Sequence, residues 1–213
     1  MKKVFVRSGL RYDYVLADGN KEFVKELCQY HVSGQLKVAP EHVVKHVTDL
    51  MGKADVNAFL TFKDWFDEAN RELGKKQYLV PYFMSSHPGC TLKDAVALAE
   101  FLRDMHMQPE QVQDFIPTPG SLSTAMYYTG INPLTGQKVY VARRAEEKQM
   151  QRALMQYKNP ANYDIVYKAL CLAGRRDLIG YGPKCLIAPS VIKVSQAVPT
   201  RQRARHAVRL SVP

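Results

Sequence analysis

The sequence predicts an α/β fold in which parallel strands form part of a (βα) barrel, followed by a mainly helical extension. Three observations support this class. Short runs rich in β-branched and aromatic residues alternate with amphipathic segments of ten or more residues. Each run ends in a loop of polar or turn-forming residues, and such loops would share one rim of a barrel. After Gly130 the strand signals fade and helices rich in Gln and Lys follow.

Strands and helices alternate through the first 130 residues. Strands are expected at residues 3–7, 35–39, 78–84 and 111–116, where β-branched and aromatic residues concentrate. Helices are expected at residues 20–31, 42–51, 57–73 and 92–105, and in a short segment ending at 128. The helix at 57–73 carries a stripe of Phe and Trp and ends before Gly74 and two lysines, which is typical of a helix stop.

The remaining chain reads as an extension. A turn at 132–136 precedes a short strand at 138–141, and helices are expected at 146–158 and 163–173. We therefore expect three parts. Residues 1–130 form about the last three to four βα units of a barrel, 131–190 form the helical extension, and 191–213 form a basic tail without fixed structure.

The segment 78–105 is the most informative βα unit. A buried-looking strand runs into the turn Ser-Ser-His-Pro-Gly-Cys at 85–90, which Thr91 follows as the expected N-cap of the next helix. Parallel α/β proteins bind ligands at the carboxyl ends of their strands. The turn is therefore a candidate site, although an ordinary βα loop has the same local pattern.

Composition narrows the function classes. The net charge of +10 suggests an anionic partner, but four arginines lie at 201, 203, 205 and 209, and this concentration in the tail weakens the inference. The tail could touch RNA phosphates, but a disordered, solvated terminus is the favoured interpretation. No apolar run reaches membrane-spanning length and no signal peptide is recognisable, so a cytoplasmic protein without a membrane partner is expected. The four cysteines, Cys28, Cys90, Cys171 and Cys185, are too scattered to form a zinc or iron–sulfur motif.

Several blocks of the sequence resemble the C-terminal portion of YgiQ-type radical S-adenosylmethionine (SAM) proteins. The blocks are VFVRSGLRYDY at 4–14, LKVAPEH at 36–42, PYFMSSHPGC at 81–90, QVQDFIPTP at 111–119, NPAN at 159–162 and GRRDLIG at 174–180. They occur in the same order over residues 3 to 190.

The resemblance implies a partial TIM-type barrel. In the family, three cysteines of a C-x3-C-x2-C loop hold a [4Fe–4S] cluster, and its open iron binds and reductively cleaves SAM. This sequence has no such loop and begins at about the fourth barrel strand. We therefore expect the cofactors SAM and [4Fe–4S] in an intact parent enzyme acting on an unknown substrate. This chain alone is expected to bind neither stably and to be catalytically incompetent, with the missing N-terminal half as one partner.

The resemblance and the strand order together imply a set of SAM contacts. Ser8 and Arg11 would meet the ribose or carboxylate of SAM, and Glu41 or His42 a hydroxyl or amine. The backbone of 83–86 and Val38 would frame the adenine, and His87 would hold the loop or transfer a proton. The cofactor-binding residues are thus Ser8, Arg11, Val38, Glu41, His42, Phe83, Ser85, Ser86 and His87.

Other readings stay open or are weaker. No catalytic residue and no metal ligand is assigned, because His42 and His46 lack the Glu of an H-E-x-x-H motif. Cys90 is more simply a small residue suited to a tight turn than a ligand-side group. The rival function is a self-standing basic module that binds RNA or protein through residues 131–209. A barrel hydrolase lacks a nucleophile elbow or recognisable triad spacing.

Overall fold

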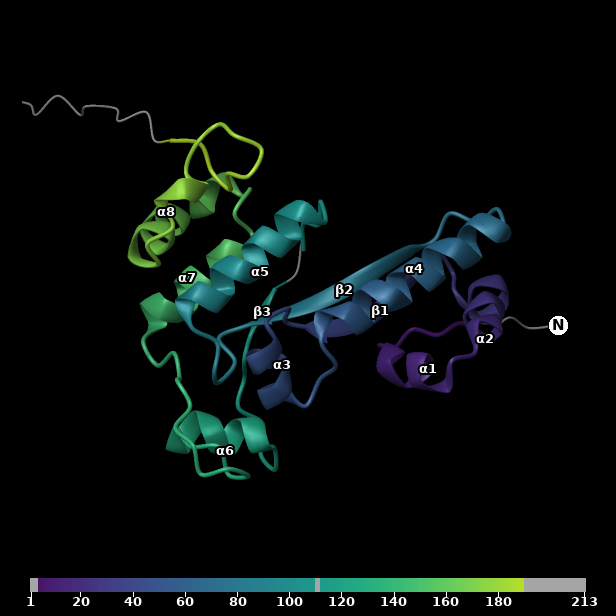
Figure 1. Cartoon of the computed structure of the whole chain (residues 1–213), viewed down its shortest axis with the longest axis horizontal. Helices are drawn as coiled ribbons and strands as arrows, with labels where there is room; N and C mark the ends of the chain where they lie inside the picture. The colour runs from purple at the N-terminus through teal and green to yellow at the C-terminus, as the bar shows by residue number, and fades with distance from the viewer. Residues whose placement is uncertain (1–3, 110–111, 190–213) are drawn as a thin grey trace, which may run out of the picture.

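The computed structural model describes residues 4–109 and 112–189, and its centre is a small parallel sheet (Figure 1). The strand order is β1-β2-β3, formed by Gln35–Glu41, Tyr78–Ser85 and Gln113–Asp114. Strand β1 pairs with β2 from Gln35 opposite Tyr78 onward, and its register shifts between Val38 and Glu41. The α/β class and the strands expected at 35–39 and 78–84 are therefore confirmed, whereas a partial barrel stays a proposal.

Helices precede β1, fill the connections between the strands and make up most of the segment that follows β3. They are α1 (Tyr12–Asp18), α2 (Lys21–Glu26), α3 (Lys45–Met51), α4 (Val56–Glu72), α5 (Leu92–Asp104), α6 (Leu122–Thr129), α7 (Ala145–Met155) and α8 (Tyr163–Leu172). A π-helical turn, Leu27–His31, continues α2, and 3-10 turns occupy Pro160–Asn162 and Arg176–Leu178. Within the described ranges, no helix combines the length and apolarity that a membrane crossing needs.

Polar caps fix where the two longest helices begin. The Asp55 side chain accepts hydrogen bonds from two backbone N–H groups in the first turn of α4. Thr91 and Asp94 form a reciprocal capping box at the start of α5, as the sequence led us to expect for Thr91. These caps place the amino end of α5 directly after the turn at 85–90.

Helices cover one face of the sheet. Leu36 and Val38 of β1 pack with aromatic residues of α4, including Phe59 and Phe62, and with residues of α1 and α2. Phe83 of β2 points to the same face and packs with Leu98 and Leu102 of α5 and with Met155 of α7. Burial of these apolar side chains supplies the main driving force for joining the strands to their helices.

The opposite face of the sheet is open. The alternate residues of β1 and β2 point there, and Gln35 and Lys37 are exposed, with Tyr78 64% and Val80 37% accessible. A 540 Å³ pocket lies on this side, lined by Lys37, Val80 and Tyr82 among others. A parallel sheet usually has both faces covered, so an open face is unusual.

The helical extension packs on the outside of α5. Leu154 of α7 and Leu170 of α8 share a fully buried cluster with Val96 and Ala99 of α5, and α5, α7 and α8 lie side by side in Figure 1. The helices expected at 146–158 and 163–173 are therefore confirmed. Their apolar faces complete the covering of α5.

Three expectations about strands need correction. Residues 4–7 form no strand; Val6 N–H instead bonds to the His31 carbonyl at 2.9 Å, and sheet pairing is limited to one bridge between Leu10 and Val38. The fourth strand is reduced to Gln113–Asp114, and the strand at 138–141 to a bridge between Lys138 and Ile131. High β-propensity did not suffice, because a strand also needs a partner in register. Residue 3 and the tail at 191–213 lie outside the described residues.

Candidate functional site

The carboxyl ends of β1 and β2 lie side by side because the strands are parallel and in register. Glu41 ends β1 and Ser85 ends β2, and Ser86 follows directly. Both Glu41 (φ 65°) and Ser86 (φ 61°) adopt the left-handed backbone region that non-glycine residues rarely use. Such strain often concentrates at binding and catalytic sites, because surrounding structure must hold it.

Both strained residues also carry buried polar atoms that no described residue partners. Glu41 pairs one carboxylate oxygen with Lys53 Nζ at 3.4 Å, while its Oε2 has no hydrogen-bond partner in residues 4–109 and 112–189. Burial raises the pKa of the Glu41 carboxyl. The Oγ of Ser86 is likewise buried and unpartnered. Unsatisfied buried groups are uncommon in proteins, so these two call for a ligand or water as their partner.

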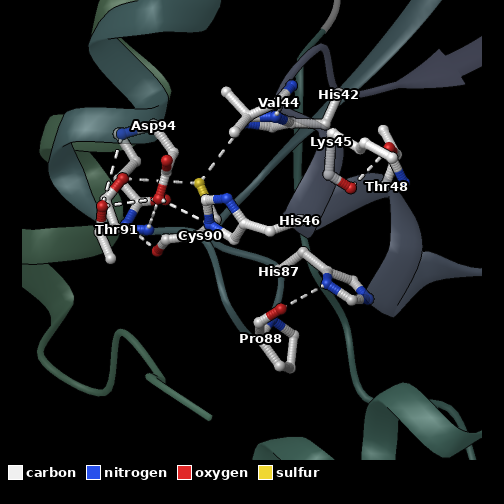
Figure 2. A network of polar contacts seen from close by, with 11 residues as sticks. His42, Val44, Lys45, His46, Thr48, His87, Pro88, Cys90, Thr91 and Asp94 are labelled. Atoms are coloured by element: carbon white, nitrogen blue, oxygen red, sulfur yellow. Dashed lines mark hydrogen bonds and ion pairs between the residues drawn. The ribbon is translucent and has the colours of Figure 1, made fainter. Parts of the chain in front are cut away.

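His42 is turned into the protein (Figure 2). Its Nδ1 accepts a hydrogen bond from Val44 N–H at 3.1 Å, so the ring proton lies on Nε2, which faces Cys90 Sγ at 3.5 Å. The ring is 1% exposed, and burial lowers its pKa to about 4. His42 is therefore neutral at neutral pH. Its contact with Cys90 connects the carboxyl end of β1 to the turn at residues 85–90 that follows β2, here called the β2 turn.

Cys90 is a packed thiol. It is buried, and desolvation raises its pKa, so it stays protonated and poorly nucleophilic at neutral pH. Next to it, the Asp94 carboxylate accepts hydrogen bonds from Thr91 N–H at 2.8 Å and Thr91 Oγ1 at 2.6 Å, and it lies 3.3 Å from His46 Nε2 (Figure 2). These hydrogen bonds hold the first turn of α5 directly after the turn at residues 85–90.

His87 also has a fixed tautomer. Its Nδ1 lies 2.7 Å from the Pro88 carbonyl, which can only accept, so Nδ1 carries the proton and Nε2 accepts from Ser123 Oγ at 2.8 Å. The ring is 2% exposed and burial lowers its pKa to about 4. A Phe115 ring packs against it edge-on at 5.1 Å. His87 thus ties the β2 turn to the start of α6.

Residues of the helical extension reach this edge of the sheet. Gln151 of α7 accepts from Ser86 N–H at 3.0 Å and donates to the Cys90 carbonyl at 2.9 Å. The neighbouring Arg152 pairs with Asp114 at 3.2 Å, and the same carboxylate accepts from Ser85 Oγ at 2.5 Å. Sequence reasoning missed Gln151, Arg152 and Asp114, because no local motif identifies contacts between residues that are 29 to 65 positions apart.

The remaining predicted residues divide into two groups. Ser8 is exposed, and Arg11 pairs with Asp13 at 2.6 Å while lining a small pocket with Ala39 and Lys53, close to the end of β1. The side chains of Val38 and Phe83 are fully buried in the helix-covered cores. Only their backbones are left to meet a ligand, and the predicted contacts of all four stay predictions.

A larger pocket of 1020 Å³ lies at the amino ends of the strands, lined by His31, Gly34 and residues 75–77 among others. Two of its nitrogen donors already have partners: Lys75 Nζ and Gln77 Nε2 both donate to the Cys28 carbonyl at 2.9 Å, whereas the buried Gln77 Oε1 has no hydrogen-bond partner among the described residues. These bonds satisfy carbonyls where the π-helical turn ends. The opposite, carboxyl edge has the stronger support for ligand binding, because there the unpartnered polar atoms belong to residues with a strained backbone.

The described residues do not offer a cluster site. No group of three or more His, Cys, Asp or Glu side chains in residues 4–109 and 112–189 is arranged to hold a metal ion. Cys28 and Cys90 are buried in separate cores, and Cys171 and Cys185 lie in the extension. The donor set of this chain does not fit a thiolate-bound [4Fe–4S] cluster.

Comparison with known proteins agrees with the resemblance noted from the sequence. The chain is 63% identical over 187 residues to a UPF0313 protein of Clostridium perfringens, covering 88% of this chain and 28% of that protein. A UPF0313 protein of Methanocella arvoryzae is 59% identical over 189 residues, 89% of this chain and 31% of its own length. One of Clostridium botulinum is 58% identical over 187 residues, 88% and 29% of the two chains.

The second half of the chain has a match of its own. Residues 110–210 match a family described as a domain of unknown function (DUF3362). The chain spans less than a third of the length of the curated relatives it matches. Relatives named UPF0313, together with the DUF3362 match, support the YgiQ-type resemblance at the level of family name.

Proposed function

We propose that the carboxyl edge of the sheet is part of a SAM-binding site in a radical SAM barrel belonging to a longer protein. The observation that carries the proposal is the pair of strained residues, Glu41 and Ser86, which present unpartnered polar atoms at adjacent strand ends. Strain and unsatisfied polarity both lower stability, so their coincidence at one edge favours a ligand there.

The residues at this edge suit SAM. The free Oε2 of Glu41 would accept from a ribose hydroxyl or the amino group, and Ser86 Oγ would bond a second polar atom. The backbone at 83–86 would border the adenine, and Arg11 would lie within the same rim for the carboxylate. In radical SAM proteins a reduced cluster and SAM together supply a 5′-deoxyadenosyl radical, while the protein contributes position and shielding.

The open face of the sheet is consistent with a barrel. In a closed (βα) barrel, helices cover only the outside and side chains of the strands fill the interior. Here Gln35, Lys37, Tyr78 and Val80 point to a face that helices leave open. We propose that further strands, present in the longer relatives, close over this face. Because this chain lacks a fitting cluster donor set, we propose that it is catalytically inactive alone.

Binding of radiolabelled SAM to the chain co-expressed with the N-terminal remainder of the Clostridium perfringens relative, measured by equilibrium dialysis, tests the proposal. Glu41→Gln should weaken binding roughly 10- to 100-fold, since a hydrogen bond to a charged acceptor is lost. The matched control is Glu22→Gln, an exposed carboxylate at the start of α2, which should bind as the parent chain does. Equal SAM affinity of the two variants would show that Glu41 does not contact SAM.

A second arm tests the enzyme class. The chain is co-expressed with the N-terminal remainder of the Clostridium perfringens relative and reconstituted anaerobically with iron and sulfide. Release of 5′-deoxyadenosine from SAM under reducing conditions, lost in the Glu41→Gln variant, is the expected result. A well-folded, cluster-loaded complex that leaves SAM intact would overturn the radical SAM assignment.

A further inference from the structure

A surface of tyrosines and basic side chains adjoins the carboxyl edge of the sheet. It lies on α6, on the segment that leads into α7 and on the first turns of α7. We call it the tyrosine–cation surface, and its members are Tyr127, Tyr128, Tyr140, Arg143, Arg144 and Lys148. None of these residues was assigned to the candidate site.

Two of its cations lack an acidic partner. Lys148 Nζ donates to Tyr127 Oη at 2.9 Å and lies 4.9 Å from the centre of that ring. Arg143 donates to the Tyr128 carbonyl at 3.0 Å, and its guanidinium lies 5.9 Å from the Tyr127 ring. No carboxylate among the described residues pairs with either side chain. The surface therefore carries uncompensated positive charge held in place by aromatic rings.

The tyrosines provide exposed rings beside these charges. Tyr128 is 67% exposed and Tyr140 is 44% exposed. The rings of Tyr128 and Tyr127 meet edge to face at 5.3 Å, Tyr127 contacts Phe115 at 5.7 Å, and Phe115 contacts His87 at 5.1 Å. An unbroken series of ring contacts thus joins the surface to the candidate site.

We propose that the tyrosine–cation surface binds a single-stranded nucleic acid. A base would stack on Tyr128, while Arg143 and Lys148 hold the neighbouring phosphates, the combination that single-strand binders use. An acidic peptide would satisfy the cations but would leave the exposed rings without a flat partner. Binding of the nucleic acid does not depend on SAM chemistry. Only the further step, that the bound nucleic acid is also the substrate of the adjoining site, rests on the proposed function.

The test is fluorescence anisotropy of a labelled mixed-sequence RNA of about twelve nucleotides, a length within the usual site size, with the full chain and no SAM. Tyr128→Ala should weaken binding about 5- to 100-fold through loss of one stacked base, and Tyr128→Phe should retain it. Tyr181→Ala is the matched control, since Tyr181 is 82% exposed and lies in the extension away from α6. Equal loss in the Tyr128→Ala and Tyr181→Ala variants would overturn the proposal.

Charge variants separate this surface from the basic tail. Replacing Arg143 and Lys148 together by Gln should reduce the slope of log affinity against log salt by about 1.4, near 0.7 for each lost phosphate contact. The exposed Arg176 replaced by Gln should leave the slope unchanged. Binding that survives the double variant and disappears only when the arginines at 201, 203, 205 and 209 are replaced would overturn the proposal. Polyglutamate that displaces the labelled RNA as effectively as unlabelled RNA does would also overturn the proposal.

Discussion

The side chain of Gln151 accepts a hydrogen bond at 3.0 Å from the backbone N–H of Ser86, a residue held at φ 61°. The same amide donates to the Cys90 carbonyl, so one side chain from α7 spans the β2 turn at both ends. Gln151 is 1% exposed, so its two hydrogen bonds to the turn are shielded from solvent. The helical extension is in this way a structural part of the candidate site.

Gln151→Leu should lower the free energy of unfolding by about 2–4 kcal/mol, because it leaves a buried N–H and a buried carbonyl without partners. Urea denaturation followed by circular dichroism measures the loss. The matched control is Gln149→Leu, an exposed glutamine on the same helix, which should change stability by less than about 0.5 kcal/mol. Equal effects at positions 149 and 151 would show that the turn does not depend on this contact.

A side chain at Gly89 should be costly. A Cβ there would lie 2.2 Å from Leu50 Cδ1, and the backbone is at φ +93°. We expect Gly89→Ala to destabilise by about 2–4 kcal/mol, from strain and overpacking together. Gly136→Ala is the control for strain alone, since φ is +72° there and nothing lies within 4 Å of the added atom.

The two glycine variants are compared by their urea midpoints. Gly136→Ala should cost only about 1–2 kcal/mol, the usual penalty of a left-handed non-glycine residue. Combining Gly89→Ala with Leu50→Ala should restore part of the loss, because the clashing methyl groups are removed. A double variant that is less stable than the sum of the two single changes would contradict the clash with Leu50.

Stability should fall as the pH drops from about 6.5 to about 4. His42 and His87 have folded-state pKa values of about 4, below the ordinary value of 6.5, because both rings are buried. The unfolded chain therefore binds more protons in this window, and protonation favours unfolding. Each histidine contributes on the order of 3 kcal/mol to the loss.

Chemical denaturation at pH 7, 5.5 and 4 checks this window. His87→Gln should flatten the dependence while lowering stability at pH 7, because Ser123 loses its acceptor. The exposed His106, which adopts φ 53°, serves as the control as His106→Asn, since Asn tolerates that backbone region. Identical pH profiles for the parent and the His87→Gln variant would show that His87 does not contribute to the loss of stability at low pH.

The sequence predicted the structure correctly where local patterns determine the secondary structure. The strand from residue 78, the cap at Thr91 and the amphipathic helix after it follow from β-propensity, capping chemistry and 3.6-residue periodicity. It placed Glu41, His42 and residues 85–87 at one edge, since parallel strands end together. It failed at residues 4–7, where β-propensity was strong but pairing was not available. The contacts of Gln151 and Arg152 depend on how α7 packs, which no local pattern encodes.

Removing the strain at the end of β2 should make the protein more stable. Ser86→Gly replaces a left-handed non-glycine residue and removes a buried hydroxyl that has no partner among the described residues. The backbone penalty is about 1–2 kcal/mol for such a residue, so the variant should gain about 0.5–2 kcal/mol after the entropic cost of glycine. The gain is read from the urea midpoint at constant m-value.

The neighbouring Ser85 supplies the control for this prediction. Ser85→Gly should be destabilising by about 1–2 kcal/mol, because Ser85 lies in β2 with ordinary strand geometry and its hydroxyl bonds to Asp114 at 2.5 Å. Opposite signs at positions 85 and 86 would identify residue 86 as one retained at the expense of stability, as binding residues often are. If Ser86→Gly and Ser85→Gly destabilise equally, the strained backbone at 86 contributes to folding, and the main structural support for a ligand at this edge is lost.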